Sequence, residues 1–240
     1  CDLNAAAGFD GEAGGAGDRY KTFQMRNEVA LYGGFDPSVG DVGWGDRDWV
    51  VNVTILSGDI GEPGLGLGEK KVRQLLAQVT DAFHLAAIYD LAVPEQLAWK
   101  VNVRGTENVV EFCRKASKLR TFVHFSTCYV SGRRTGTVLE DELQMGQGFK
   151  NHYESTKHEA EIIVRNAWDK VPTIVIRPAI TVGDSRTGET NKFDGPYFGM
   201  ILIDALKILQ IPMPYLGDSL AEVNLVPLDY LVRGTVALWK

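Results

Sequence analysis

The sharpest chemical signal in the sequence is a tyrosine followed four residues later by a lysine, Tyr153 and Lys157, in the run Tyr-Glu-Ser-Thr-Lys. Residues four apart share one face of a helix, with Cβ atoms about 6 Å apart. An ammonium beside a phenol favours the phenolate, so we expect the pKa of Tyr153 to be lowered from about 10 towards neutrality. Such a tyrosine can act as a general acid or base on a carbonyl or hydroxyl. Alone the spacing is a weak signal, because a surface tyrosine beside a solvated lysine gives the same pattern.

Small and hydroxyl residues at the ends of two strand-like runs strengthen this signal. One run ends in Ser126 and Thr127, whose hydroxyls would lie at the carboxyl edge of a sheet, where α/β folds bind their ligands. A hydroxyl there can hydrogen-bond the reacting oxygen while Tyr153 donates its proton. Another run ends in Ala86 and Ala87, which would let a flat cofactor approach the backbone.

The positions of these residues depend on strand-like and helix-like segments that alternate from about residue 50 onwards. Apolar, β-branched runs predict strands, and apolar residues at helical spacing predict helices. The expected strands are 50–56, 83–87, 121–128 and 172–178, and the expected helices are 69–79, 97–115, 153–168 and 197–209. This order is typical of α/β proteins and predicts right-handed crossovers on one parallel sheet.

The beginning of the chain differs from the remainder in composition and in pattern. Residues 1–60 carry ten acidic and four basic side chains, which accounts for the whole net charge of −6, and 15 of the 26 glycines lie in residues 1–68. Short β-like pieces and polar loops replace the alternation. We therefore divide the chain into a Gly/Asp-rich, β-rich segment, residues 1–57, and an α/β domain, residues 58–240.

Composition excludes several classes of protein. A net charge of −6 argues against nucleic acid as a partner, and the lack of any run of 18 apolar residues argues against a transmembrane segment. The three cysteines form no C-x-x-C pair and no histidine has ligand spacing, so we expect neither a disulfide framework nor a metal site. The chain begins at Cys1 and ends at Lys240 inside an apolar run, so we expect both ends to be cuts in a longer chain.

Residues 56–240 resemble an extended short-chain dehydrogenase/reductase of the thioester-reductase and fatty-acyl reductase (male-sterility) branch. The resemblance rests on the Tyr153/Lys157 pair with the hydroxyls that precede it, and on segments 184–197 and 224–229. It implies a Rossmann-like sheet that binds NADP or NAD, and hydride transfer from the reduced nicotinamide to a carbonyl. In that branch the carbonyl belongs to an acyl thioester or an aldehyde, so a small-molecule or carrier-bound acyl substrate is expected.

The resemblance also implies roles for individual residues. Thr127, Tyr153 and Lys157 would form the catalytic triad, with Thr127 preferred to Ser126 at the hydroxyl position. The residues implied to contact the cofactor are Asp59 and Ile60 at the adenine, Lys157 at the nicotinamide ribose, and Ala86, Ala87 and Pro178. The residues implied to contact the substrate are Ser126, Tyr197 and Asn224. NADPH is favoured over NADH by the resemblance.

One part of the family pattern is missing, the strand, T-G-x-x-G-x-x-G turn and helix that would bind the pyrophosphate. Gly8, Gly11 and Gly14 have the spacing, but no apolar strand precedes them and no amphipathic helix follows. Residues 18–60 instead resemble a segment of secreted right-handed β-helix proteins. We therefore hypothesise a chimera in which this fragment replaces the first βαβ unit, and we expect impaired cofactor binding.

The expected fold class is α/β, with a Rossmann-like parallel sheet that lacks its first βαβ unit and an irregular β-rich N-terminal segment. The first function hypothesis is an NAD(P)H-dependent reductase of an acyl thioester or aldehyde. The alternatives are a nucleotide-sugar or steroid-type epimerase or dehydrogenase of the same superfamily, and a non-catalytic protein that has lost its cofactor-phosphate site. The reductase part is expected in the cytoplasm, whereas the N-terminal segment resembles secreted proteins.

Overall fold

The computed structural model of this chain divides into two units, residues 1–177 and residues 178–240. The residues that the structure describes are 29–32, 53–56, 59–89, 92–190, 195–210, 212 and 223–240. The glycine pattern at Gly8, Gly11 and Gly14 lies outside these residues, as does most of the segment 1–57. The boundary placed after residue 57 therefore stays a prediction.

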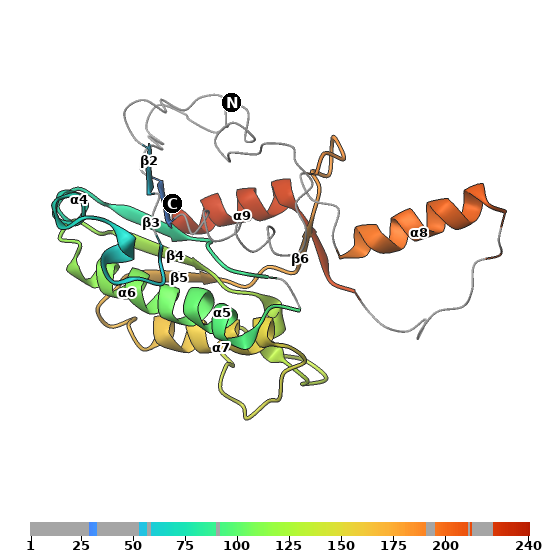
Figure 1. Ribbon diagram of the computed structural model, residues 1–240, viewed down its shortest axis with the longest axis horizontal. Helices are drawn as coiled ribbons and strands as arrows, with labels where there is room; N and C mark the ends of the chain where they lie inside the picture. Colours follow the sequence, from blue (N-terminus) through green and yellow to red (C-terminus); the bar gives the residue numbers. More distant parts are fainter. Residues whose placement is uncertain are drawn as a thin grey trace. The chain divides into compact units, whose positions relative to one another are not determined.

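A parallel three-stranded sheet forms the centre of the first unit (Figure 1). Its strands are β3 (Asp81–His84), β4 (Thr121–Phe125) and β5 (Thr173–Ile176), in the order β3-β4-β5. The register pairs His84 with His124 and Phe125 with Ile176, so the carboxyl ends of the three strands meet at one edge. The parallel sheet predicted by the alternation is confirmed.

Helices α5 (Glu95–Ala98), α6 (Gly105–Lys115) and α7 (His152–Arg165) run along one face of this sheet (Figure 1). The sequence predicts one helix over 97–115, but a turn of π-helix, η3 (Trp99–Arg104), separates α5 from α6. Apolar residues recur at helical spacing along α6 and α7, which buries one stripe of each helix against the strands. The core includes Val109, Val110, Phe112, Phe122 and Val164.

Helix α4 (Glu69–Leu76) precedes β3 and follows a 3-10 turn, η2 (Pro63–Gly66). Gly66 has a φ of +65°, and a Cβ atom there would lie 2.6 Å from the backbone nitrogen of Asp59. Only glycine fits such a close approach in this conformation without strain. The geometry supports the interpretation of the run 64–68 as loop glycine rather than as a phosphate-binding turn.

Two short strands precede the parallel sheet, β1 (Val29–Tyr32) and β2 (Val53–Leu56). They pair with each other in antiparallel register, and β1 lies beside β3. The strand predicted over 50–56 is therefore present as β2, but it pairs with β1 instead of joining the parallel sheet.

The second unit contains two short parallel strands, β6 (Ile180–Val182) and β7 (Leu225–Pro227), and two helices, α8 (Pro196–Ile208) and α9 (Leu228–Trp239). Asp229 in the first turn of α9 accepts the backbone and hydroxyl hydrogen bonds of Ser185 at 2.9 and 3.0 Å. This contact ties the loop after β6 to the start of α9. Within the described part of the chain, no helix is both long and apolar enough to cross a membrane.

Candidate active site

Thr127 and Tyr153 meet at the carboxyl edge of the sheet. Thr127 caps the 3-10 turn η4 (Cys128–Ser131), where its hydroxyl oxygen accepts from the Tyr129 N–H at 3.3 Å. Helix α7, whose first turn carries Tyr153, packs against η4, and the Thr127 side chain lowers the pKa of Tyr153. The two residues predicted to hold one reacting oxygen are thus brought together.

The start of α7 is fixed by a cap that sets the position of Tyr153. The Asn151 side-chain oxygen accepts from the Glu154 N–H at 2.9 Å, and the Glu154 carboxylate accepts from the Lys150 N–H at 2.9 Å. Caps of this kind satisfy backbone donors that the first helical turn leaves unpaired. Tyr153 lies two residues after Asn151, so the local sequence that forms the cap also sets the position of Tyr153 at the start of the helix.

Lys157 lies one turn further along α7 and is almost fully buried, with 3% of its surface exposed. Its ammonium donates to the carbonyl oxygen of Phe125, the last residue of β4, at 2.6 Å. Burial lowers the pKa of Lys157 to about 8, and the carboxylate of Glu161 opposes this shift. The site therefore holds a lysine that changes charge close to neutral pH.

The lowered pKa expected for Tyr153 is wrong for this structure. Burial raises the pKa of Tyr153, followed in size by a lowering effect of the Thr127 hydrogen bond and by raising effects of Cys128, Tyr129 and Glu154. The i, i+4 spacing brings the Cβ atoms together, but the Lys157 ammonium is bonded to a backbone carbonyl on β4. Tyr153 is consequently held as a neutral phenol, the form that donates a proton.

The loop that follows β3 carries Ala86 and Ala87 and is fastened by Asn102 in the π-helical turn. The Asn102 side chain accepts from the Ile88 N–H at 2.8 Å and donates to the Ile88 carbonyl at 3.0 Å. It also donates to the Thr156 hydroxyl at 3.0 Å, beside Lys157. The sequence predicts that Asn102 lies in a helix, but it does not indicate that the side chain holds the loop after β3.

Asp59 and Ile60, predicted to contact the adenine, follow β2. The Asp59 carboxylate accepts from the Gly61 N–H at 2.8 Å and from the Lys100 ammonium at 2.9 Å. Ile60 has no exposed surface, and a Cβ atom at Gly105 would lie 2.6 Å from its Cδ1. Asp59 stays half-exposed, whereas the Ile60 side chain is part of the core; the adenine contact itself stays a prediction for both.

The predicted substrate residues are divided between the units. The Ser126 hydroxyl is buried and donates to Glu161 at 2.6 Å. In the second unit, the Tyr197 hydroxyl accepts from the Gly183 N–H at 2.8 Å, and the Asn224 carbonyl accepts from the Ile180 N–H at 3.2 Å. Their contact with substrate stays a prediction. Pro178, predicted to line the cofactor, directly follows Arg177 at the start of the second unit.

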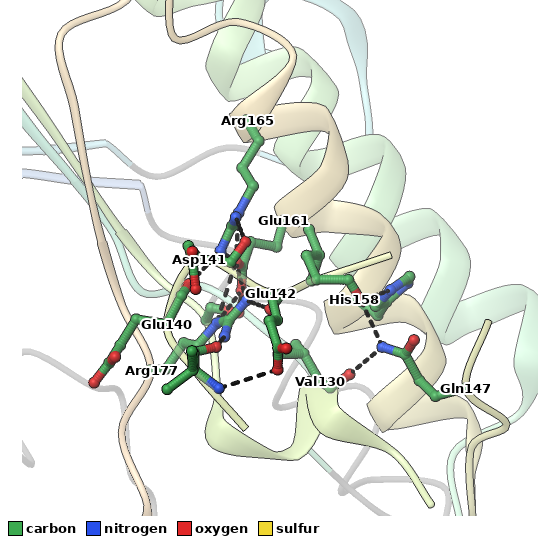
Figure 2. Close-up of polar contacts among 12 residues, drawn as sticks. Val130, Glu140, Asp141, Glu142, Gln147, His158, Glu161, Arg165 and Arg177 are labelled. Carbon is green, nitrogen blue, oxygen red and sulfur yellow. Dashed lines mark hydrogen bonds and ion pairs between the residues drawn. The ribbon is translucent and has the colours of Figure 1, made fainter. Parts of the chain in front are cut away.

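Sequence reasoning missed a buried carboxylate next to this site. Glu161 has no exposed surface and is held by Ser126, Arg165 and Arg177 (Figure 2). The spacing was visible, because Glu161 lies four residues after Lys157 and four before Arg165. Its partners outside α7 are Ser126, directly after β4, and Arg177, directly after β5. No local sequence pattern could indicate that these two residues meet Glu161.

The chain matches one protein family and is similar to several reductases. The family model for the male sterility protein matches residues 26–235. Fatty acyl-CoA reductase wat of Drosophila melanogaster is 26% identical over 212 residues, covering 77% of this chain and 40% of that protein. L-2-aminoadipate reductase of Saccharomyces cerevisiae is 26% identical over 209 residues, covering 81% of this chain and 14% of that protein. The chain thus spans well under half the length of these relatives.

Solved structures show the same fold. The terminal R domain from the myxalamid PKS-NRPS biosynthetic pathway superposes with a TM-score of 0.66 and 27% identity, over 76% of this chain and 46% of that one. UDP-glucuronic acid 4-epimerase from Bacillus cereus has a TM-score of 0.57 at 24% identity, over 75% of this chain and 54% of that one. These matches confirm the Rossmann-like fold and the resemblance to the thioester-reductase and fatty-acyl reductase branch. The family match starts at residue 26, inside the segment 1–57, whose foreign origin stays a hypothesis. The chain belongs to the male sterility protein family.

Proposed function

We propose that this chain is the catalytic part of an NAD(P)H-dependent reductase that acts on an acyl thioester or an aldehyde. One observation carries the proposal: the end of β4 and the first turns of α7 bring Thr127, Tyr153 and buried Lys157 together at the carboxyl edge of a parallel sheet, where the Phe125 carbonyl holds the Lys157 ammonium. Ligands of open α/β sheets bind at this edge. The names of the relatives support the substrate class, since they include fatty acyl-CoA reductases and a thiolation-reductase di-domain.

The described residues fit the nicotinamide end of such a cofactor. Ala86 and Ala87 follow β3 as Ser126 and Thr127 follow β4, and the strands are in parallel register. Their small side chains leave the backbone approachable, and Asn102 holds the loop through Ile88. Lys157 is the cation that would serve a ribose hydroxyl, and NADP is the cofactor that the resemblance favours.

A reduced nicotinamide, when bound, would supply the hydride. Thr127 and Tyr153 would donate hydrogen bonds to the carbonyl oxygen and stabilise the negative charge that develops on it. On a thioester, hydride addition to the carbonyl carbon and departure of the sulfur as a thiolate, which then takes a proton from water, give an aldehyde and a thiol. On an aldehyde, hydride addition and a proton from the Tyr153 hydroxyl give an alcohol. The phenolate left on Tyr153 would then regain its proton from water.

The acyl group would arrive as a small molecule or on a carrier, and the reaction would take place in the cytoplasm. A sugar-nucleotide epimerase is the alternative with the same residues, and the structural likeness to the Bacillus cereus epimerase concerns the fold alone. The contact between Thr127 and Tyr153 serves both chemistries. The substrate therefore has to be decided by assay.

The test is oxidation of NADPH and NADH by the purified chain with an acyl-CoA, a carrier-bound acyl thioester and a long-chain aldehyde, and, for a UDP-sugar with added NAD, chromatographic analysis of the sugar product. We expect oxidation with the thioester or the aldehyde, and loss of at least about 100-fold in kcat in Tyr153→Phe, because a general acid contributes 10²–10⁴-fold. Tyr230→Phe, at an exposed tyrosine of α9, is the matched control and should keep its activity. Turnover of the UDP-sugar alone, or full activity in Tyr153→Phe, would contradict the proposal.

A further inference from the structure

Glu161 is the centre of a buried charge cluster on α7. Its carboxylate accepts from the Ser126 hydroxyl at 2.6 Å, from the Arg165 Nε at 2.9 Å and from the Arg177 guanidinium at 2.8 and 3.0 Å (Figure 2). Both arginines are mostly buried. A buried carboxylate is tolerated only when its charge is paired and its oxygens are bonded, and Glu161 meets both conditions.

The two arginines use their remaining N–H groups to hold one loop. Arg165 and Arg177 donate to the carbonyl oxygens of four consecutive residues, 139–142. The distances are 3.3 Å to Leu139, 2.7 Å to Glu140, 2.7 Å to Asp141 and 2.8 Å to Glu142. Because a guanidinium is planar and rigid, its orientation on Glu161 sets the position of the carbonyls that it binds.

On the other side, Glu161 reaches the strand end that carries the catalytic contacts. Two consecutive residues at the end of β4 are each held by a different side chain of α7: Phe125 by Lys157 and Ser126 by Glu161. Thr127, which follows them, lowers the pKa of Tyr153 on the same helix. Ser126 stands in the middle, so its bond to Glu161 constrains the backbone on both sides.

Glu161 also acts on Lys157 through charge. The titratable groups coupled to Lys157 are Glu161 on its own helix, His84 on β3 and His124 on β4, and Tyr153 lies one turn earlier on the helix. Burial lowers the pKa of His84 to about 3 and that of His124 well below its ordinary value, so both are neutral at neutral pH. Tyr153 is neutral as well, because burial raises its pKa. Glu161 therefore supplies the negative charge in this set.

We propose that Glu161 is a positioning residue of the reductase: through Ser126 it fixes the end of β4 that presents Thr127 and accepts the Lys157 ammonium, and through its arginines it couples this corner to loop 139–142. The inference rests on the proposed reductase function. If Glu161 had only a structural role, it would stabilise the fold without affecting the ionisation of Lys157.

The test compares Glu161→Gln and Ser126→Ala with Glu111→Gln, a control on α6 whose exposed carboxylate pairs with Arg114 at 3.0 Å. Ser126→Ala cuts the link to β4 but keeps the arginines, so it covers the case in which Glu161→Gln fails to fold. We expect kcat to fall about tenfold in Ser126→Ala, because loss of this charge-assisted hydrogen bond frees the end of β4 that presents Thr127. Glu111→Gln should keep the kcat of the wild type.

A second readout needs neither cofactor nor substrate. In protein labelled with ¹³Cε-lysine, the Lys157 resonance is identified by its loss in Lys157→Met and then titrated. We expect Glu161→Gln to move its midpoint down by about one pH unit, because an opposite charge nearby favours the ionised form. An unchanged midpoint in folded Glu161→Gln, or wild-type kcat in Ser126→Ala, would overturn the inference. If the wild type is inactive but Glu161→Gln still shifts the Lys157 midpoint, the result contradicts the proposed function and supports the charge coupling between Glu161 and Lys157.

Discussion

Replacing Lys157 with methionine should stabilise the protein at neutral pH while it abolishes reduction. Methionine is of similar length and carries no charge, so it removes the cost of burying an ammonium. Burial lowers the pKa of Lys157 from its ordinary value of 10.5 to about 8. At 1.36 kcal/mol per pKa unit, this difference corresponds to about 3 kcal/mol of lost stability at pH 7.

The sign of the pH dependence follows from proton binding. Between pH 8 and pH 10.5 the unfolded chain holds a proton on Lys157 that the folded protein has released, so the wild type gains stability as the pH rises. The gain between pH 7 and pH 9.5 is about 2 kcal/mol. Methionine leaves the Phe125 carbonyl without its donor, which costs about 1 kcal/mol at any pH. Lys157→Met should therefore be about 2 kcal/mol more stable than the wild type at pH 7 and about equal to it at pH 9.5.

Urea unfolding followed by tryptophan fluorescence at several pH values from 7 to 9.5 measures this difference. The pH dependence of the wild type alone would not isolate Lys157, because a second group also titrates. Burial raises the pKa of Cys113 to about 12, so the unfolded chain releases this proton at a lower pH than the folded protein, and both proteins lose stability at high pH. The difference between the two proteins cancels that effect. Lys170→Met, at an exposed lysine, controls for the loss of one positive charge. A difference that stays constant from pH 7 to pH 9.5 would refute the reasoning.

Three further predictions concern the frame of the site and its cofactor. Asn102→Ala should lose about 3 kcal/mol in the free energy of unfolding by urea, because the buried N–H and carbonyl of Ile88 lose their partner. Gly105→Ala should lose about 1–3 kcal/mol because the new Cβ would overlap Ile60, whereas Gly199→Ala, with open space around it, should lose nothing. Isothermal titration should give dissociation constants for NADPH well above the micromolar range, because the pyrophosphate turn is expected to be missing; micromolar binding would contradict the expected impairment of cofactor binding.

The parts of the site that could be predicted from the sequence depend on local geometry. Tyr153 and Lys157 share a helix face at a spacing of four, and Thr127 follows a buried strand, so the family pattern identifies all three. The parallel sheet follows from the alternation of strands and helices in the same way. The π-helical turn has no comparable signal, although it places Asn102 against both Ile88 and Thr156.

The pKa of Tyr153 could not be predicted, because residue spacing fixes the position of a Cβ atom on the helix but not the position of the polar group at the end of the side chain. The Lys157 ammonium had two candidate partners, the Tyr153 phenol on its own helix and the Phe125 carbonyl on β4, and the structure has it on the carbonyl. Burial then outweighs the Thr127 hydrogen bond at Tyr153. Both facts depend on how α7 packs on β4, which is a tertiary property.

The same limit explains why a visible pattern on α7 was interpreted only in part. Tyr153, Lys157, Glu161 and Arg165 follow one another at intervals of four, so phenol, ammonium, carboxylate and guanidinium form one stripe along the helix. On a surface, such a stripe stabilises a helix by a few tenths of a kcal/mol per pair. Here the middle two residues are buried, and each needs a partner from outside the helix: Phe125 for Lys157, and Ser126 with Arg177 for Glu161. A stripe of alternating charge that continues from a Tyr-x-x-x-Lys pair thus predicts a buried network when the helix packs against the strand that ends in the hydroxyl proposed to be catalytic.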